Sequence, residues 1–297
     1  MPTPTEVPQS SPSPAAAAAT PGLTMPARMA VFLGSVLGAV LGVGGLIAAV
    51  VRVIPEAALQ PTVQIAPLAL AFLIAHWVMA RWVHRDGGAY VGLDRRALDG
   101  GLLVQGALLG VLAIGVPSLL LLVTGELRFE QGEALGSTTG TLLPLLLLLV
   151  PAALWEELAF RGYLLSALRE QTGTWPALLA TSALFGVIHL TNPGATALST
   201  AAVALAGIFL GLVRIRTGSL YAAWAAHLAW NLTMAVGLRT PVSGTSVALP
   251  GYRIVDAGPD WLTGGAWGPE GGCAAMLSMG VASWYLVRRQ RREERTT

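Results

Sequence analysis

The sequence predicts an all-α, polytopic membrane protein, built as a bundle of about eight transmembrane helices. Two observations predict it: 54% of the 297 residues are hydrophobic and only 11% are charged, whereas a soluble domain carries about 25% charged residues. So little charge cannot cover a water-facing globule of this size. The composition therefore excludes an ordinary soluble enzyme, a disordered chain and a nucleic-acid-binding domain.

Eight segments approach the roughly 20 mostly apolar residues that a spanning helix needs. They lie near residues 30–51, 63–82, 102–123, 142–165, 175–190, 195–213, 220–238 and 273–287. The fourth segment is unusual because it contains charged residues, and the fifth is short. We interpret residues 28–290 as one membrane domain, with the chemically informative motifs between residues 140 and 240.

Three further segments are polar or irregular. Residues 1–27 are rich in Pro, Ser, Thr and Ala and carry one charge, which predicts a disordered N-terminal tail. Residues 291–297 form a basic C-terminal tail. The loop over residues 240–272 is long and rich in Gly, Pro and Trp, and it is either a flexible external loop or a lid that gates a site.

The arginines predict the orientation, because cytoplasmic loops carry an excess of basic residues. With both termini inside, 13 of the 18 arginines lie in inner segments, four lie in outer segments, and Arg161 lies within the fourth helix. We therefore expect an N-in, C-in topology. The expected location is the plasma membrane of a bacterium.

Strongly polar groups occur inside apolar segments, where an ionised side chain costs at least about 2.5 to 3.5 kcal/mol. Glu156 and Glu157 are adjacent in the fourth segment. Glu157 and Arg161 are four residues apart, so they share a helix face and can pair. Glu156 points about 100° away from Glu157, which leaves it without a local cation. A desolvated glutamate of this kind is a suitable general base.

Histidines and an asparagine add to this pattern on other helices. His227 and Asn231 are four residues apart and share a face, and His189 follows Phe185 at the same spacing. Measured along their helices at about 1.5 Å per residue, these groups lie at depths similar enough to converge in one layer. His76, in the second segment, is interpreted as a structural histidine. Each group alone also fits a packing or hydrogen-bonding role.

The three motifs in order are Glu156-Glu157-x-x-x-Arg161, Phe185-x-x-x-His189 and His227-x-x-x-Asn231. This pattern resembles that of the type II CAAX prenyl protease and bacteriocin-processing family (CPBP, also called Abi). The motifs lie on separate hydrophobic helices, and the eight-helix layout is similar to the family over most of the chain.

The resemblance implies an intramembrane glutamate protease. It implies that Glu156 is the general base that activates water, that His189 positions or activates that water, and that His227 and Asn231 stabilise the oxyanion. Glu157, Arg161 and Phe185 would support the site. Peptide hydrolysis needs these same functions: an activated water, oxyanion stabilisation and a proton for the leaving amine.

Two questions concern the ligands. If a metal ion such as zinc is bound, its ligands would be Glu156, His189 and His227. The helical HExxH arrangement of many zinc proteases is absent from the sequence. We therefore favour catalysis without a metal. The expected partners are the lipid bilayer and a membrane-associated peptide or protein substrate, prenylated or not, cut near its C-terminus.

Two other classes of protein fit parts of the pattern. A proton-coupled transporter would use the glutamates and histidines as a proton relay, but it predicts repeat symmetry and a polar path across both leaflets, and the sequence shows neither. A non-catalytic bacteriocin-immunity or scaffold protein would keep the fold without the activity.

Overall fold

The computed structural model describes residues 23–53, 61–131, 138–246, 249 and 251–293. It is mostly helical, as predicted, and helices occupy all eight predicted positions. The longer helices are α1 (Met25–Val53), α2 (Pro61–Val78), α3 (Gly100–Thr124), α4 (Thr138–Glu157), α6 (Thr174–Ile188), α7 (Ala197–Thr217), α8 (Leu220–Leu232) and α10 (Cys273–Glu293).

Shorter elements extend or connect these helices. Helices α2 and α8 continue as the π-helical turns η3 (Met79–Val83) and η7 (Thr233–Leu238), and α4 continues through the π-helical η5 (Leu158–Tyr163) into α5 (Leu164–Thr172). The remaining elements are β1 (Leu127–Gln131), β2 (Tyr252–Asp256), α9 (Asp260–Thr263) and the 3₁₀ turns η4 (Ala89–Val91), η6 (His189–Thr191), η8 (Gly265–Trp267) and η9 (Pro269–Gly271).

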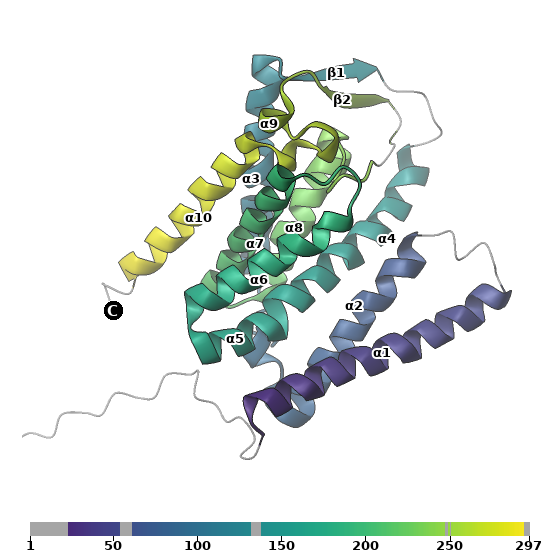
Figure 1. Ribbon diagram of the computed structural model, residues 1–297, viewed down its shortest axis with the longest axis vertical. Coiled ribbons are helices and arrows are strands. Elements are labelled where there is room, and N and C mark those ends of the chain that lie inside the picture. Colours follow the sequence, from purple (N-terminus) through teal and green to yellow (C-terminus); the bar gives the residue numbers. More distant parts are fainter. Residues whose placement is uncertain (1–22, 54–60, 132–137, 247–248, 250, 294–297) are drawn as a thin grey trace, which may run out of the picture.

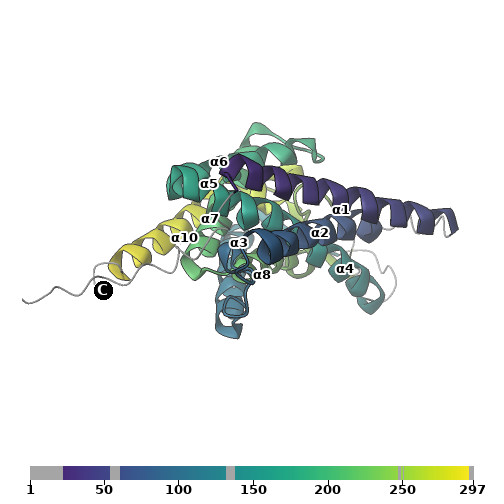
Figure 2. The same ribbon diagram turned by 90° about the horizontal axis from the view of Figure 1, so that it is seen from below.

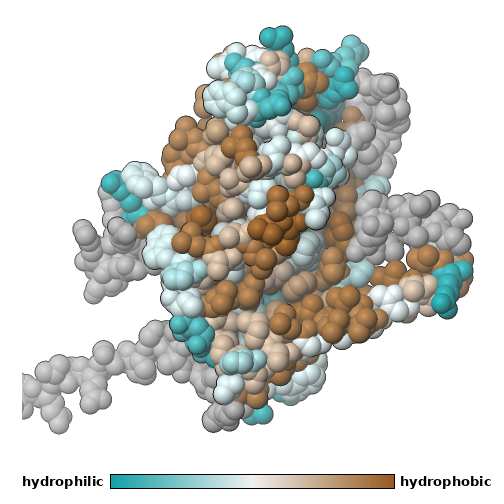
Figure 3. Space-filling view, viewed as in Figure 1, coloured by the Kyte–Doolittle hydropathy of each residue, from teal (hydrophilic) through white to brown (hydrophobic). Residues whose placement is uncertain are grey.

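Six helical spans in the described residues are long and apolar enough to cross a membrane, which makes the chain a polytopic helical membrane protein. They are Met25–Val53, Ile65–Val83, Gly100–Thr124, Leu142–Thr172, Thr174–Thr191 and Ala197–Thr217. The other two predicted segments are helical but are not among the six: α8 has only 13 residues, and α10 ends in a run of arginines. Figure 3 shows hydrophobic side chains across the middle of one face, with hydrophilic ones above and at the lower left.

Several predicted boundaries shift. The fourth helix does not stop at residue 165 but continues to Thr172, because the π-helical turn and a kink redirect it without ending it. Residues 25–27, predicted to belong to a disordered tail, form the first turn of α1; residues 1–22 lie outside the described residues. Helix α10 reaches Glu293, so the predicted basic tail over 291–297 begins as helix, and residues 294–297 lie outside the described residues.

The main core lies between α3, α7, α8 and α10, which pack side by side (Figure 1). Glycines allow the closest approaches. A Cβ at Gly106 or Gly110 of α3 would overlap the carbonyl oxygen of Ala222 or Ala226 in α8. Close backbone packing through small residues is a usual way for membrane helices to associate. It brings the face of α8 that carries His227 into the protein interior.

The α1–α2 hairpin lies beside this core, and its helix α2 packs against α4. Figure 2 shows the hairpin at one side of the molecule. Its buried contacts centre on Phe32 and Met79, with Tyr163 of η5 stacked on Phe32 at 4.6 Å between ring centroids. Leu37, Leu41 and other apolar residues of α1 stay exposed. In a spanning helix such a surface faces lipid.

The loop predicted over residues 240–272 is not uniformly flexible. It contains β2, which pairs antiparallel with β1 from Leu127↔Asp256 to Gln131↔Tyr252, and the short helical turns α9, η8 and η9. Trp267 is almost fully buried, and Gly244 N donates to its carbonyl at 3.0 Å. This ordered layer covers one end of the bundle, at the top of Figure 1.

Candidate active site

Glu156 and Glu157 close the α-helical part of the fourth span, and they face different surroundings, as predicted from the helical spacing. The side chain of Glu157 is fully buried, whereas that of Glu156 keeps 16% of its surface exposed. Only the second carboxylate is therefore enclosed by protein on every side. The two adjacent acids can act differently because their environments differ.

Glu157 is the centre of a buried ionic network. Its Oε1 accepts a hydrogen bond from Arg161 NH1 at 3.0 Å and one from His227 Nδ1 at 2.9 Å. The Arg161 guanidinium also donates to the carbonyl oxygen of Gly207 at 3.3 Å and lies over the Phe185 ring at 4.1 Å. These contacts confirm the predicted Glu157–Arg161 pair. The pair, on α4 and η5, is in contact with α6, α7 and α8.

The helix that carries the two glutamates is distorted directly after them. Residues 158–163 form a π-helical turn, and the backbone of Gly162 leaves the helical region with ψ −120°. The freed N–H of Tyr163 donates to His76 Nε2 at 3.1 Å, and His76 Nδ1 donates to Phe72 O at 2.7 Å. His76 is thus a buried histidine that accepts the backbone N–H freed by the kink, in agreement with its structural interpretation.

His189 lies at the C-terminal end of α6 and faces Glu156. Its Nδ1 is 2.7 Å from the carbonyl oxygen of Phe185, so Nδ1 carries the hydrogen and Nε2 is directed elsewhere. Nε2 is 3.9 Å from Oε2 of Glu156. The spacing of four residues between Phe185 and His189 therefore fixes the orientation of the histidine ring through the helix's own backbone.

His227 faces the same carboxylate oxygen from α8. Its Nε2 is 3.7 Å from Glu156 Oε2, while Nδ1 is bound to Glu157. The two histidine Nε2 atoms and Glu156 Oε2 thus converge from three helices. Both distances exceed those of direct hydrogen bonds.

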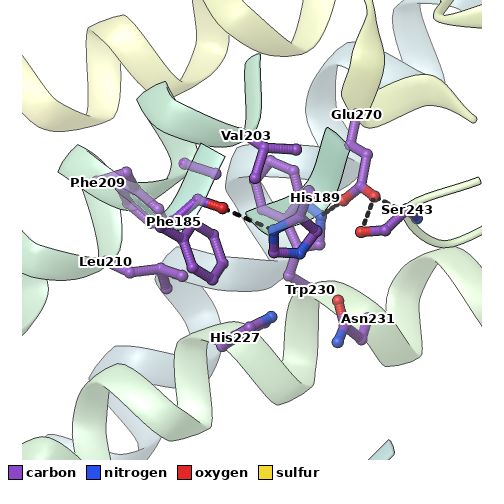
Figure 4. A pocket seen from close by; sticks show the side chains of 11 residues that line it. Phe185, His189, Val203, Phe209, Leu210, His227, Trp230, Asn231, Ser243 and Glu270 are labelled. Atoms are coloured by element: carbon purple, nitrogen blue, oxygen red, sulfur yellow. Dashed lines mark hydrogen bonds between the residues drawn. The ribbon is translucent and has the colours of Figure 1, made fainter. Parts of the chain in front are cut away.

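A pocket adjoins these groups. Figure 4 shows His189, His227 and Asn231 directed toward it among apolar side chains. Its lining consists of Phe185, His189, Val203, Ala206, Phe209, Leu210, His227, Trp230, Asn231, Ser243 and Glu270. Asn231 lies one turn beyond His227 and brings an amide to the wall. Glu156 does not line the pocket itself, but it lies next to His189 and His227, which do.

Glu270 is a part of the site that the sequence motifs did not reveal. It precedes α10, is 8% exposed, and its carboxylate accepts hydrogen bonds from Trp230 Nε1 at 2.6 Å and from the backbone N–H of Ser243 at 2.6 Å. Ser243 Oγ donates to the same carboxylate at 3.0 Å. Trp230 and Asn231 are adjacent in sequence, so Glu270 ties the outer layer directly to the helix that carries His227.

A signal for Glu270 exists in the sequence but is weak. The acid stands within Gly-rich residues just before an apolar segment, and nothing in that pattern distinguishes it from a solvated loop residue. Trp230 could equally have been an apolar core residue. Only the folded position of the 240–272 segment brings these residues to the pocket.

A bound metal ion needs several donor side chains that converge on one point. Among the described residues, no group of three or more His, Cys, Asp or Glu side chains has an arrangement that could hold one. The three groups that the sequence suggested as ligands, Glu156, His189 and His227, do converge, but they do not form such a group.

The described residues therefore form a helical membrane protein with a largely buried glutamate–histidine centre. Residues 138–233, about a third of the chain, match the family model described as type II CAAX prenyl endopeptidase Rce1-like. This part of the chain is similar to that family of membrane proteases, in agreement with the resemblance that the motifs indicate. The match includes all three motifs. No curated protein and no solved structure matches the chain.

Proposed function

We propose that the protein is an intramembrane endopeptidase that uses Glu156 to activate water. The observation that carries the proposal is the convergence of Glu156 Oε2 with the Nε2 atoms of His189 and His227, at 3.9 and 3.7 Å, beside a pocket. A water molecule between these three atoms would be within reach of a carboxylate base. General bases act through such contacts, directly or through one water.

His189 positions this water. Because its Nδ1–H is bound to Phe185 O, its Nε2 is the nitrogen available to the reacting centre. The backbone bond prevents the ring from turning, so the acceptor stays directed at the space beside Glu156. Attack of the water on the peptide carbonyl transfers its proton to Glu156, which then delivers it to the leaving amine.

His227 and Asn231 stabilise the negative charge that develops on the carbonyl oxygen. Glu157 accepts from Nδ1 of His227, so Nε2 is the atom that faces the pocket, and when protonated it can donate to the oxyanion. The network then holds two carboxylates, Arg161 and a protonated imidazole, with no net charge. An uncompensated buried charge would be strongly destabilising. The Asn231 amide supplies a second donor from the same helix face.

We propose that the reaction needs no metal ion, since each of these functions is assigned to a side chain. The family description makes a membrane-anchored protein or peptide, cut near its C-terminus, the first substrate class to test. Whether the substrate carries a prenyl group is a separate property, to be measured with paired farnesylated and unmodified peptides.

The test is a cleavage assay in detergent with these paired membrane peptides. Glu156→Gln removes the base but keeps the size of the side chain, and Glu126→Gln, in the turn after α3, is the matched control. We expect cleavage by the wild type and the control and none by Glu156→Gln. Addition of a chelator should leave the rate unchanged. Equal cleavage by Glu156→Gln would refute the role of Glu156, and a well-folded wild type that cuts no peptide would refute the function.

A further inference from the structure

The two ends of the helical bundle differ in charge. At one end lie the beginning of α1, the segment between α2 and α3, and the ends of α5 and α7. These parts are joined by the Arg28–Glu170 ion pair at 2.6 Å and by hydrogen bonds from Tyr90 to Glu170, Ser219 to Ala97 O, Leu220 N to Gly92 O and Tyr221 to Leu93 O.

This end carries most of the arginines. The described arginines on these connected segments are Arg28, Arg81, Arg85, Arg95, Arg96, Arg169, Arg214 and Arg216, and α10 ends in a further run that begins at Arg288. We call it the arginine-rich end. By the rule that basic residues stay on the cytoplasmic side, it is the cytoplasmic end.

The opposite end carries the β1–β2 pair and the ordered 240–272 segment. It holds Arg128, Arg239 and Arg253 and several acids, including Glu130, which pairs with Arg253 at 2.7 Å. The fourth arginine expected on this side of the membrane is Arg52, in the last turn of α1. Its parts are joined by hydrogen bonds from Asn192 Nδ2 to Ser243 O and from Ala257 N to Glu126 O. We call it the arginine-poor end.

The pocket belongs to the arginine-poor end. His189 ends α6 there, and Ser243 and Glu270 of the 240–272 segment form the wall. Glu156 lies 14 residues after Leu142 and 16 before Thr172 in its span, and its Oε2 is 3.9 Å from Nε2 of His189. The polar centre therefore lies beside the C-terminal end of α6, and Ser243 and Glu270, which line the pocket next to it, belong to the arginine-poor end.

We propose that the site receives its substrate from the extracytoplasmic side, and that the substrate is a peptide segment exposed on that face with an apolar side chain near the cut bond. The walls formed by Val203, Phe209 and Leu210 suit such a side chain. A prenylated C-terminus held in the cytoplasmic leaflet would lie on the wrong side. This inference about the substrate rests on the proposed proteolytic function.

The chain allows a direct topological test, because Cys273 is its single cysteine. In a Cys273→Ala background, three separate cysteines are introduced: Ala257→Cys, exposed at the arginine-poor end; Leu98→Cys, exposed at the arginine-rich end; and Ser243→Cys, in the pocket wall. Intact cells expressing each full-length variant are treated with a small membrane-impermeant thiol reagent, before and after permeabilisation.

We expect Ala257→Cys and Ser243→Cys to be labelled in intact cells, and Leu98→Cys only after permeabilisation. The reverse pattern would overturn the proposal. So would labelling of Ala257→Cys in intact cells without labelling of Ser243→Cys, because the pocket would then be closed to that side. None of these readings requires activity, so they stand even if the protease function fails.

An activity arm then tests the substrate. Two single-span reporters carry the same library of apolar segments, one just outside the membrane and one just inside. We expect cleavage of the outer reporter alone, abolished by Glu156→Gln. Cleavage of the inner reporter alone would refute extracytoplasmic access while supporting the protease. Cleavage of neither, with labelling as expected, would refute the protease function and, with it, the inference about the substrate.

Discussion

The bond between His76 and the kink after the two glutamates predicts that His76 and Gly162 are energetically coupled. A Cβ at position 162 would overlap His76 Nε2, the same atom that accepts the N–H of Tyr163 at 3.1 Å. Gly162→Ala must therefore displace the imidazole and break this buried hydrogen bond. In a His76→Ala background neither the overlap nor the bond exists, so the same alanine should be tolerated.

The magnitude follows from the contacts that are lost. A buried N–H left without an acceptor costs about 1 to 3 kcal/mol, and forcing an extra methyl group into a packed site costs a similar amount. We expect Gly162→Ala to reduce the free energy of unfolding by about 2 to 4 kcal/mol in the wild type and by less than about 1 kcal/mol beside His76→Ala. The coupling energy is then about 1 to 3 kcal/mol, as for residues in direct contact.

The measurement is equilibrium unfolding in mixed detergent–SDS micelles for the wild type, both single variants and the double variant. Gly115→Ala is the matched control, because a Cβ there would lie at an ordinary 3.9 Å from Thr233 Cγ2. It should show no coupling with His76→Ala. Additivity of His76→Ala and Gly162→Ala within about 0.5 kcal/mol would refute the reasoning that His76 supports the kink.

Three further predictions concern the site. Glu157→Gln should reduce the free energy of unfolding by about 3 to 5 kcal/mol, because it leaves Arg161 buried without its partner. Glu156→Gln should change the free energy of unfolding by less than about 1 kcal/mol. Equal losses of stability in thermal unfolding of the two variants would contradict the difference in their roles. Asn231→Ala should lower kcat by about 10²- to 10³-fold, as expected for an oxyanion donor, and an unchanged kcat in the peptide assay would exclude that role. Glu270→Ala should destabilise the layer over the pocket, visible as faster hydrogen exchange in residues 240–272; unchanged exchange would mean that its hydrogen bonds are dispensable there.

Much of the fold was predictable because a membrane restricts the choices. An apolar run of about 20 residues has essentially one way to satisfy its backbone in lipid, which is a helix. Distortions inside helices were not predictable. The π-helical turn over 158–163 depends on an acceptor from another helix, His76, and local propensity contains no information about that partner.

The candidate site divides in the same way. The Glu157–Arg161 contact is a four-residue spacing on one helix, so the sequence implies it. The separate surroundings of Glu156 and Glu157 also follow from helical periodicity. In contrast, the contact of Glu157 with His227 joins residues 70 positions apart and depends on how α4 and α8 pack.

By itself the sequence determined that the chain is a helical membrane protein and which residues are candidates for chemistry, because hydropathy and helical spacing are local properties. Only the tertiary structure decided that Glu156, His189 and His227 meet, that Glu270 closes the pocket wall, and that residues of the arginine-poor end line the pocket. These depend on contacts between distant helices, where small residues such as Gly106 and Gly110 let the backbones approach. Packing, unlike periodicity, is a property of pairs of segments, and no single segment encodes it.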